Sequence, residues 1–245
     1  MKCRRESFDD VARVLFPKNP SRGQDFLESI AFLDEIDGSD DSNLIASLQA
    51  RIATLESELS TPRWEDLRAP APSFALGGSS DPGFIKVLDD GSGSTGVFAY
   101  AFDASTEEEL FQVFQMPHSW AGGDIRAHVH WMPVSTAGSA GLDVCWGLEY
   151  SWAAIGSVFG NTEFLYGDVQ HLGSGETLTA DTHYLTAIGD ISGLGKGISS
   201  MLICRIFRDA TGVGGTDDYT ADAALLELDL HYQVDSFGSR WEYVK

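Results

Sequence analysis

From residue 63 onward, apolar residues recur at every second position in short segments, and turns rich in glycine, serine, aspartate and threonine separate these segments. A period of two predicts β-strands with one buried face. Eight segments carry the pattern clearly and two carry it weakly: 97–102, 109–115, 124–134, 142–152, 163–170, 183–188, 198–207 and 224–234, then 84–88 and 240–244. Because no long helical pattern intervenes, residues 63–245 predict a mainly β body, an antiparallel β-sandwich of the jelly-roll type.

Alternation within these strands assigns one face to the core and the other to solvent. In 224–234 the predicted core face is Leu226, Leu228, Leu230, Tyr232 and Val234. The polar face of that segment is Glu227, Asp229, His231 and Gln233. In 142–152 the predicted core face is Val144, Trp146, Leu148, Tyr150 and Trp152.

The first part of the chain has a helical period instead. Residues 1–41 carry apolar residues at helical spacing, interrupted by Pro17 and Pro20, and end in a stretch rich in glycine and aspartate. We expect them to form a helical attachment region that docks on another protein and becomes ordered on binding.

Residues 42–62 predict a short coiled-coil stalk. Their apolar residues are spaced three, four, three and four apart, which is the a/d pattern of a coiled coil. The seam consists of Ile45, Leu48, Ile52, Leu55 and Leu59. Arg51 and Glu56 occupy g and e positions, where charges of neighbouring parallel chains meet. Isoleucine at a with leucine at d favours two strands in isolated peptides, although a larger attached oligomer can override that preference.

Charge and cysteine content exclude several classes of protein. The net charge of −21 disfavours partners with phosphate backbones or anionic lipid surfaces, so we expect no nucleic acid and no membrane among the partners. The basic N-terminus is not followed by the apolar run of a secretion signal. The three cysteines, Cys3, Cys145 and Cys204, are far apart and do not predict a disulfide framework, and the last two lie in strand patterns as small core residues.

One segment resembles a metal-binding motif. Gly122, His128 and His130 match the start of the cupin pattern, Gly-x5-His-x-His, but no glutamate follows three or four residues later. His231 or Glu149 could complete a three-ligand set if their strands lie next to this one. Strand alternation, however, assigns Trp131 to the core face and places both histidines opposite the core. We therefore expect a structural histidine pair, with no catalytic residue, no cofactor and no metal; a metal shared between subunits is the intermediate possibility.

Two further features have weaker functional interpretations. The loop 209–222 contains several aspartates but lacks the spacing of a calcium loop, so we expect it to be solvated and flexible. Trp64 and Trp120 lie in loop-like stretches and could contact a sugar, although packing at the edge of the body is the simpler expectation.

Four motifs resemble a family of tailed-bacteriophage virion proteins. They are WEDLRAP (64–70), QMPHSW (115–120), AHVHW (127–131) and VCWGLEY (144–150), and the resemblance extends from Trp64 to about Val234. It implies a β-sandwich structural protein, usually trimeric, that is exposed on the head, neck or tail. It provides no catalytic residues, and the His-x-His motif transfers only as a signature of the fold.

The sequence therefore predicts a non-enzymatic virion protein, synthesised in the host cytoplasm. We expect a homotrimer that acts as a head decoration or spike, or as a neck or tail component, and binds other virion proteins through residues 1–41. Two alternatives belong to other classes: a cupin-like metal-binding enzyme that uses His128 and His130, and a carbohydrate-binding module that recognises a host surface glycan.

Overall fold

The computed structural model describes residues 41–139, 142–168 and 177–242. The chain divides into two compact units, Met1–Ser60 and Thr61–Lys245. Predictions for residues 1–40 lie outside the described residues. Among the residues that are described, no helix is both long enough and apolar enough to cross a membrane.

In the first unit, helix α3 (Asp41–Ser60) covers the whole of the predicted seam. Its sequence contains four leucines and three alanines, which are good helix formers. Pro62 follows two residues after the last helical residue, where it disfavours continuation of the helix.

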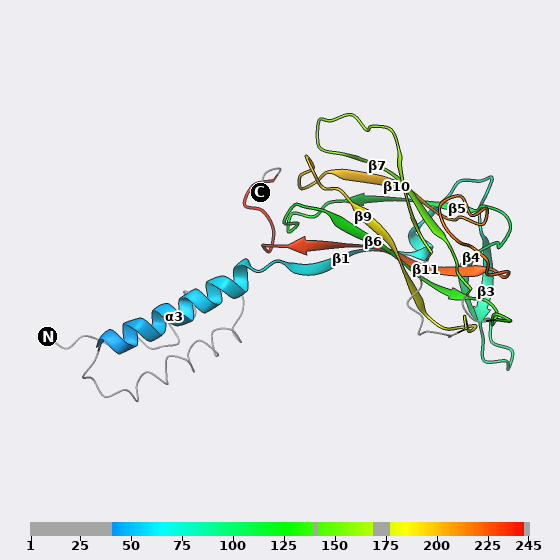
Figure 1. Ribbon diagram of the computed structural model, residues 1–245, viewed down its shortest axis with the longest axis horizontal. Coiled ribbons are helices and arrows are strands. Elements are labelled where there is room, and N and C mark those ends of the chain that lie inside the picture. The colour runs from blue at the N-terminus through cyan, green and yellow to red at the C-terminus, as the bar shows by residue number, and fades with distance from the viewer. Residues whose placement is uncertain (1–40, 140–141, 169–176, 243–245) are drawn as a thin grey trace. The chain divides into compact units, whose positions relative to one another are not determined.

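The second unit is a sandwich of two antiparallel sheets (Figure 1). In the first sheet, β11 is central: it pairs with β6 along one edge and with β1 and β4 along the other. Strand β3 lies outside β4, and β9 lies outside β6. The strands are β1 (Arg63–Pro70), β3 (Gly83–Leu88), β4 (Val97–Phe102), β6 (Ile125–Pro133), β9 (Tyr184–Ile191) and β11 (Ala223–Val234).

The second sheet has the order β2-β5-β10-β7-β8. Its strands are β2 (Ala75–Leu76), β5 (Glu109–Gln115), β7 (Trp146–Ala153), β8 (Glu163–Gly167) and β10 (Met201–Arg208), and a short 3-10 helix, η1 (Ala71–Ser73), precedes β2. From β4 to β11 the chain changes sheet at every step except β7 to β8. The predicted mainly β body and its β-sandwich architecture are therefore confirmed.

The core lies between the two sheets and is rich in aromatic residues. Trp131 and Trp146 are fully buried, and Trp152 is 6% exposed, as the strand alternation predicted. Cys145 and Cys204 are buried free thiols, which confirms their assignment as small core residues.

The predicted face assignment fails at one end of β11. A β-bulge between Leu225 and Glu227 shifts the pairing with β6, so the alternation changes by one position. Leu225 packs in the main core, whereas Leu226 packs against a small separate cluster that contains Met132 and Ala224. From Leu228 to the end of the strand the prediction is correct.

Two predictions about the positions of strands are also wrong. Residues 63–70 form strand β1, although the consecutive charges Glu65 and Asp66 hid the alternation. Residues 240–242 form bends rather than a strand. Trp120 packs against the body, as the simpler expectation had it: it is 1% exposed, its ring lies 5.5 Å from that of Trp152, and it is not available to a sugar.

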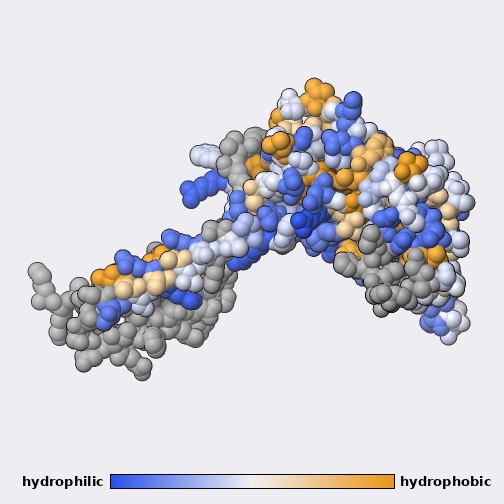
Figure 2. Space-filling model, in the orientation of Figure 1, coloured by the Kyte–Doolittle hydropathy of each residue, from blue (hydrophilic) through white to orange (hydrophobic). Residues whose placement is uncertain are grey.

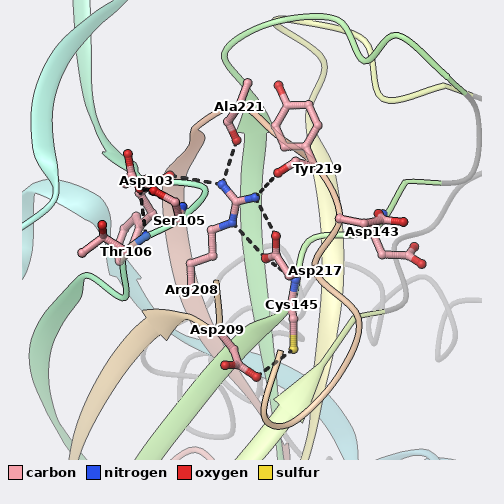
Figure 3. A network of polar contacts seen from close by, with 12 residues as sticks. Asp103, Ser105, Thr106, Asp143, Cys145, Arg208, Asp209, Asp217, Tyr219 and Ala221 are labelled. Carbon is pink, nitrogen blue, oxygen red and sulfur yellow. Dashed lines mark hydrogen bonds and ion pairs between the residues drawn. The ribbon is translucent and has the colours of Figure 1, made fainter. Parts of the chain in front are cut away.

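The loop 209–222 is held by an ordered network of polar contacts (Figure 3), although its residues 211–214 are exposed, as expected of a solvated loop. Arg208 is fully buried and forms a bidentate ion pair with Asp217, whose side chain is 1% exposed. Its remaining N–H groups donate to the carbonyl oxygens of Phe102, Tyr219 and Ala221. All five guanidinium donors are therefore used, and the loop is fixed to the body.

Candidate functional site

The outer face of the first sheet carries a cluster of imidazoles around one buried carboxylate. We call this set, His128, His130, His183, Asp229 and His231, the imidazole cluster. Antiparallel pairing of β6 with β11 places His128 opposite Asp229 and His130 opposite Glu227. Pairing of β1 with β11 places Asp66 opposite His231. His183 immediately precedes β9, the other neighbour of β6.

Asp229 is at the centre of the imidazole cluster. Its Oδ2 lies 2.8 Å from His231 Nε2 and 3.6 Å from His130 Nε2, and its Oδ1 lies 3.7 Å from His128 Nδ1. The rings of His128 and His231 are 4.2 Å apart between centroids. The Asp229 side chain is only 6% exposed, so these contacts occur with little competition from water.

Two more contacts surround this centre. His130 Nδ1 lies 2.7 Å from His183 Nε2, so one of these two nitrogens carries a proton that the other accepts. His231 Nε2 also lies 3.1 Å from Asp66 Oδ1. An open groove of about 470 Å³ lies along this face, and its lining includes Asp66, His130, His183, Asp229 and His231.

The protonation of these groups follows from their surroundings. Burial lowers the pKa of His128, and the nearby His231 adds to this effect. The contact with Asp229 raises the pKa of His130. Burial acts to raise the pKa of Asp229, but the contacts with His130, His231 and His128 outweigh it, so this carboxyl has a pKa below its usual value. The cluster therefore favours an ionised Asp229 beside a neutral His128.

The four candidate metal ligands named from the sequence separate into two groups. His128, His130 and His231 lie together, because β6 and β11 are neighbours. Glu149 lies on β7 in the other sheet, where it pairs with Arg205 at 2.8 Å. All three histidines are on the outer face of the sheet, because Ala127, Val129 and their neighbours fill the core. They therefore do not form a cupin-type site between the sheets.

Sequence reasoning missed Asp229, Asp66 and His183 as members of this site. Asp229 shares the polar alternation of His231, which is a signal that it points to the same face. Nothing in the sequence alone indicates that β11 pairs with both β1 and β6, or that the residue before β9 reaches His130. Among these side chains, one ligand atom each from His128, Asp229 and His231 lie within 4.8 Å of one another, a separation from which they could hold a metal ion.

Side chains from the segment WEDLRAP (64–70) and from β6 supply further contacts around this face. Arg126 lies over the ring of Trp64, 5.1 Å from its centroid. Arg68 forms a bidentate ion pair with Glu227. His118, from the QMPHSW motif, contacts the hydroxyls of Ser199 and Ser239. WEDLRAP and AHVHW therefore contribute neighbouring side chains to one surface of the folded body.

Helix α3 carries a separate candidate surface. We call Ile45, Leu48, Ile52 and Leu55 the α3 seam. These four apolar side chains are 54%, 41%, 53% and 40% exposed in the single chain. Figure 2 shows hydrophobic and hydrophilic residues side by side on this helix. Repeated exposure of apolar side chains at a/d spacing is typical of a surface that pairs with another helix.

Comparisons with known proteins add little to this picture. No family model matches the chain, and no curated protein matches it. One solved structure to which it is similar is described as TmCBM61 in complex with beta-1,4-galactotriose, at 13% sequence identity. The match covers 72% of this chain and 88% of that chain, with a TM-score of 0.28. A likeness this low carries no argument about fold or function.

Proposed function

We propose that this chain is a non-enzymatic structural subunit of a tailed-bacteriophage virion and that it assembles as a homotrimer. The observation that carries the proposal is the α3 seam, which exposes four large apolar side chains in a single chain. Burying each half-exposed side chain against neighbouring copies would contribute about 1 kcal/mol. Copies of the same helix are the favoured partners, because the heptad pattern is self-complementary and Arg51 can meet Glu56 of a neighbour.

The virion assignment rests on the resemblance of the motifs, and the placement of two of these motifs in the folded body supports it. The motif residues Trp64, Arg68, His128 and His130 gather on one face, which gives a physical reason for their occurring together. The order of the eight strands β4 to β11 is also that of a jelly roll. Jelly rolls occur in viral capsid and lectin domains and in cupins, so the fold alone does not select among these functions.

Residues 1–41 are proposed to attach the trimer to another virion protein. The same proposal places the subunit on the head, as a decoration or spike, or in the neck or tail. Synthesis in the host cytoplasm is compatible with the buried free thiols of Cys145 and Cys204.

The oligomer is tested by light scattering on the full-length protein at micromolar concentration. We expect the mass of three chains. Ile52→Asp introduces a charge into the α3 seam and should lower that mass, because three carboxylates would meet in an apolar interface. Ala50→Asp is the matched control, since Ala50 is exposed on the opposite side of the helix. A monomeric wild-type protein, or equal masses for the two variants, would contradict assembly through the seam.

The virion role needs a separate test. Mass spectrometry of purified particles from a phage that encodes this chain should detect the protein at a copy number divisible by three. A chain that forms trimers in solution but is absent from particles would leave the oligomer intact and refute the virion role.

Glycan recognition is the second candidate, because Trp64 is 48% exposed on the same face as the imidazole cluster. Arg126 lies over one side of that ring, and the exposed part of the ring could stack on a sugar. A glycan array probed with wild-type protein and with Trp64→Ala separates this function from a purely structural one. Binding that depends on Trp64 supports it, and the absence of binding on the array argues against it.

A further inference from the structure

The imidazole cluster contains two buried polar atoms that lack hydrogen bonds. Among the residues that the structure describes, His128 Nδ1 and Asp229 Oδ1 are enclosed and have no hydrogen-bond partner. They lie 3.7 Å apart, which is too far for a hydrogen bond between them. A buried polar atom without a partner loses its hydration and gains nothing in return. Such a pair indicates that a group able to contact both atoms belongs between or beside them.

The spacing of the surrounding ligand atoms fits a small cation. One atom each from His128, Asp229 and His231 lie within 4.8 Å of one another. Zinc is bound at about 2.1 Å by imidazole and carboxylate ligands in a tetrahedron, so such ligand atoms are about 3.4 Å apart. The 3.7 Å from Asp229 Oδ1 to His128 Nδ1 is close to that value, and small side-chain rotations would bring the third ligand into place.

We propose that His128, Asp229 and His231 bind a divalent transition metal ion of the zinc class. Two imidazoles and one carboxylate favour such ions over magnesium or calcium, which prefer sites made only of oxygen. His231 Nε2 now lies between Asp229 Oδ2 and Asp66 Oδ1 at 2.8 and 3.1 Å. On binding, the ion takes the place of the proton on this nitrogen, and Asp66 or a water molecule completes the coordination.

The other members of the imidazole cluster orient the ligands. His183 Nε2 lies 2.7 Å from His130 Nδ1, and this contact fixes the ring of His130 so that its Nε2 faces Asp229 Oδ2 at 3.6 Å. A polar group that faces one oxygen of a ligating carboxylate helps to direct the other oxygen at the metal. His130 and His183 are therefore positioning residues for the site, and neither is a ligand.

A network of histidines and carboxylates without any ion is the competing explanation. It accounts for the contacts of Asp229 Oδ2 but leaves Oδ1 and His128 Nδ1 without partners. The metal site accounts for both sets of atoms. It also requires nothing from α3, so it can succeed or fail independently of the proposed trimer.

The test uses untagged full-length protein that has been stripped with a chelator and desalted. Calorimetric titration with Zn²⁺ should show one ion bound per chain, and Mg²⁺ should show none. Co²⁺ should give the visible absorption of a four-coordinate site. His128→Gln and His231→Gln should each weaken Zn²⁺ binding by more than about 100-fold, and His183→Gln by about 10- to 100-fold, as expected for a residue that only orients a ligand. Far-ultraviolet circular dichroism checks that each variant is folded.

His118→Gln is the matched control, because His118 contacts Ser199 and Ser239 and lies outside the imidazole cluster. It should bind Zn²⁺ as the wild type does. A three-ligand protein site would be filled at roughly 100 µM Zn²⁺. Absence of Zn²⁺ binding by the wild type at this concentration would overturn the proposal. Unchanged binding by folded His128→Gln and His231→Gln would overturn it too, since the ion would then lie elsewhere.

Discussion

Arg208 and Asp229 are both buried charges, but their surroundings satisfy them to different extents. Every N–H group of Arg208 donates a hydrogen bond, either to Asp217 or to a backbone carbonyl (Figure 3). Asp229 is equally enclosed, yet its Oδ1 accepts no hydrogen bond from the described residues. We call the first a closed cluster and the second an open one. In a closed cluster every polar atom has a partner, as expected of a group that only stabilises the fold. In an open cluster a polar atom without a partner can still bind a ligand.

The two clusters also differ in what surrounds the charge. Arg208 anchors the loop that directly follows it in the sequence. Its partner carboxylate, Asp217, is only nine residues away. Asp229 collects imidazoles from separate strands, and imidazole is a common metal ligand. Stability alone does not require an arrangement of this kind, because apolar residues of similar volume would cover the sheet at lower cost.

Breaking the closed cluster should have the largest effect on stability. Arg208→Met leaves Asp217 buried without its counter-charge, and removing one partner of a buried ion pair costs about 3–5 kcal/mol. Urea unfolding at fixed protein concentration measures the loss. Adding Asp217→Leu to the same variant removes the stranded carboxylate and should restore part of the stability. If the double variant is less stable than the single one, the pair is not the source of the cost.

Filling the open cluster should have the next largest effect. A ligand that binds only the folded state stabilises it by about 2.7 kcal/mol at a concentration of 100 times its Kd. Zn²⁺ should therefore raise the unfolding free energy of the stripped wild type by about this amount, and chelator should reverse the gain. Asp229→Asn should abolish the gain. A metal-dependent gain that persists in this variant would show that the ion does not bind at the imidazole cluster.

Much of the sandwich could be predicted from alternation, because side-chain period reports directly on which face of a strand is buried. In this way the alternation predicts Trp131, Trp146 and Trp152 as core residues. The prediction failed where local geometry breaks the period. The bulge beside Leu226 inserts one residue, and a shift of one position exchanges the two faces of the strand. No feature of the segment 224–234 itself signals that insertion.

The candidate site was predictable only in part, for a different reason. His128 and His130 share a strand face, which sequence spacing alone can establish. The contact between His128 and Asp229 depends on which strands pair, and that follows from the topology of the whole body. Arg208 and Asp217 are close in sequence but meet only because the intervening loop folds back over Cys145, which the excess of glycine and aspartate concealed.

The outer face of the second sheet provides an intermediate case. Arg205 pairs with Glu107, Glu109 and Glu149 at 2.6–3.0 Å, but its side chain is 18% exposed and those of the glutamates are 21–36% exposed. Partly exposed ion pairs are worth about 1 kcal/mol or less. Arg205→Met should therefore cost about 1 kcal/mol in urea unfolding, well below the cost of Arg208→Met. Equal losses for the two arginines would mean that burial does not govern the difference between the clusters.

The smallest expected effect is on the reactivity of the Cys145 thiol, which lies beside the closed cluster. Burial raises the pKa of Cys145 to about 12, and the neighbouring Asp209 adds to the shift. At pH 8 only about one such group in ten thousand is a thiolate, the form that reacts with alkylating reagents. The same holds for Cys204, whose pKa burial also raises to about 12. Native protein should therefore show almost no labelling of either cysteine by iodoacetamide at pH 8, and both should react fully in urea.

Labelling then reports on which cluster has been opened. Cys145 N–H donates to Asp217, so loss of Arg208 should loosen the loop around Cys145 without affecting Cys204, which lies among other core residues. Peptide mass spectrometry should detect faster labelling of Cys145 in Arg208→Met and unchanged labelling of Cys204. In Asp229→Asn neither cysteine should change, because the imidazole cluster is on the outer face of the other sheet. Equal acceleration at both cysteines in Arg208→Met would indicate global unfolding, and the closed cluster would then have no local role.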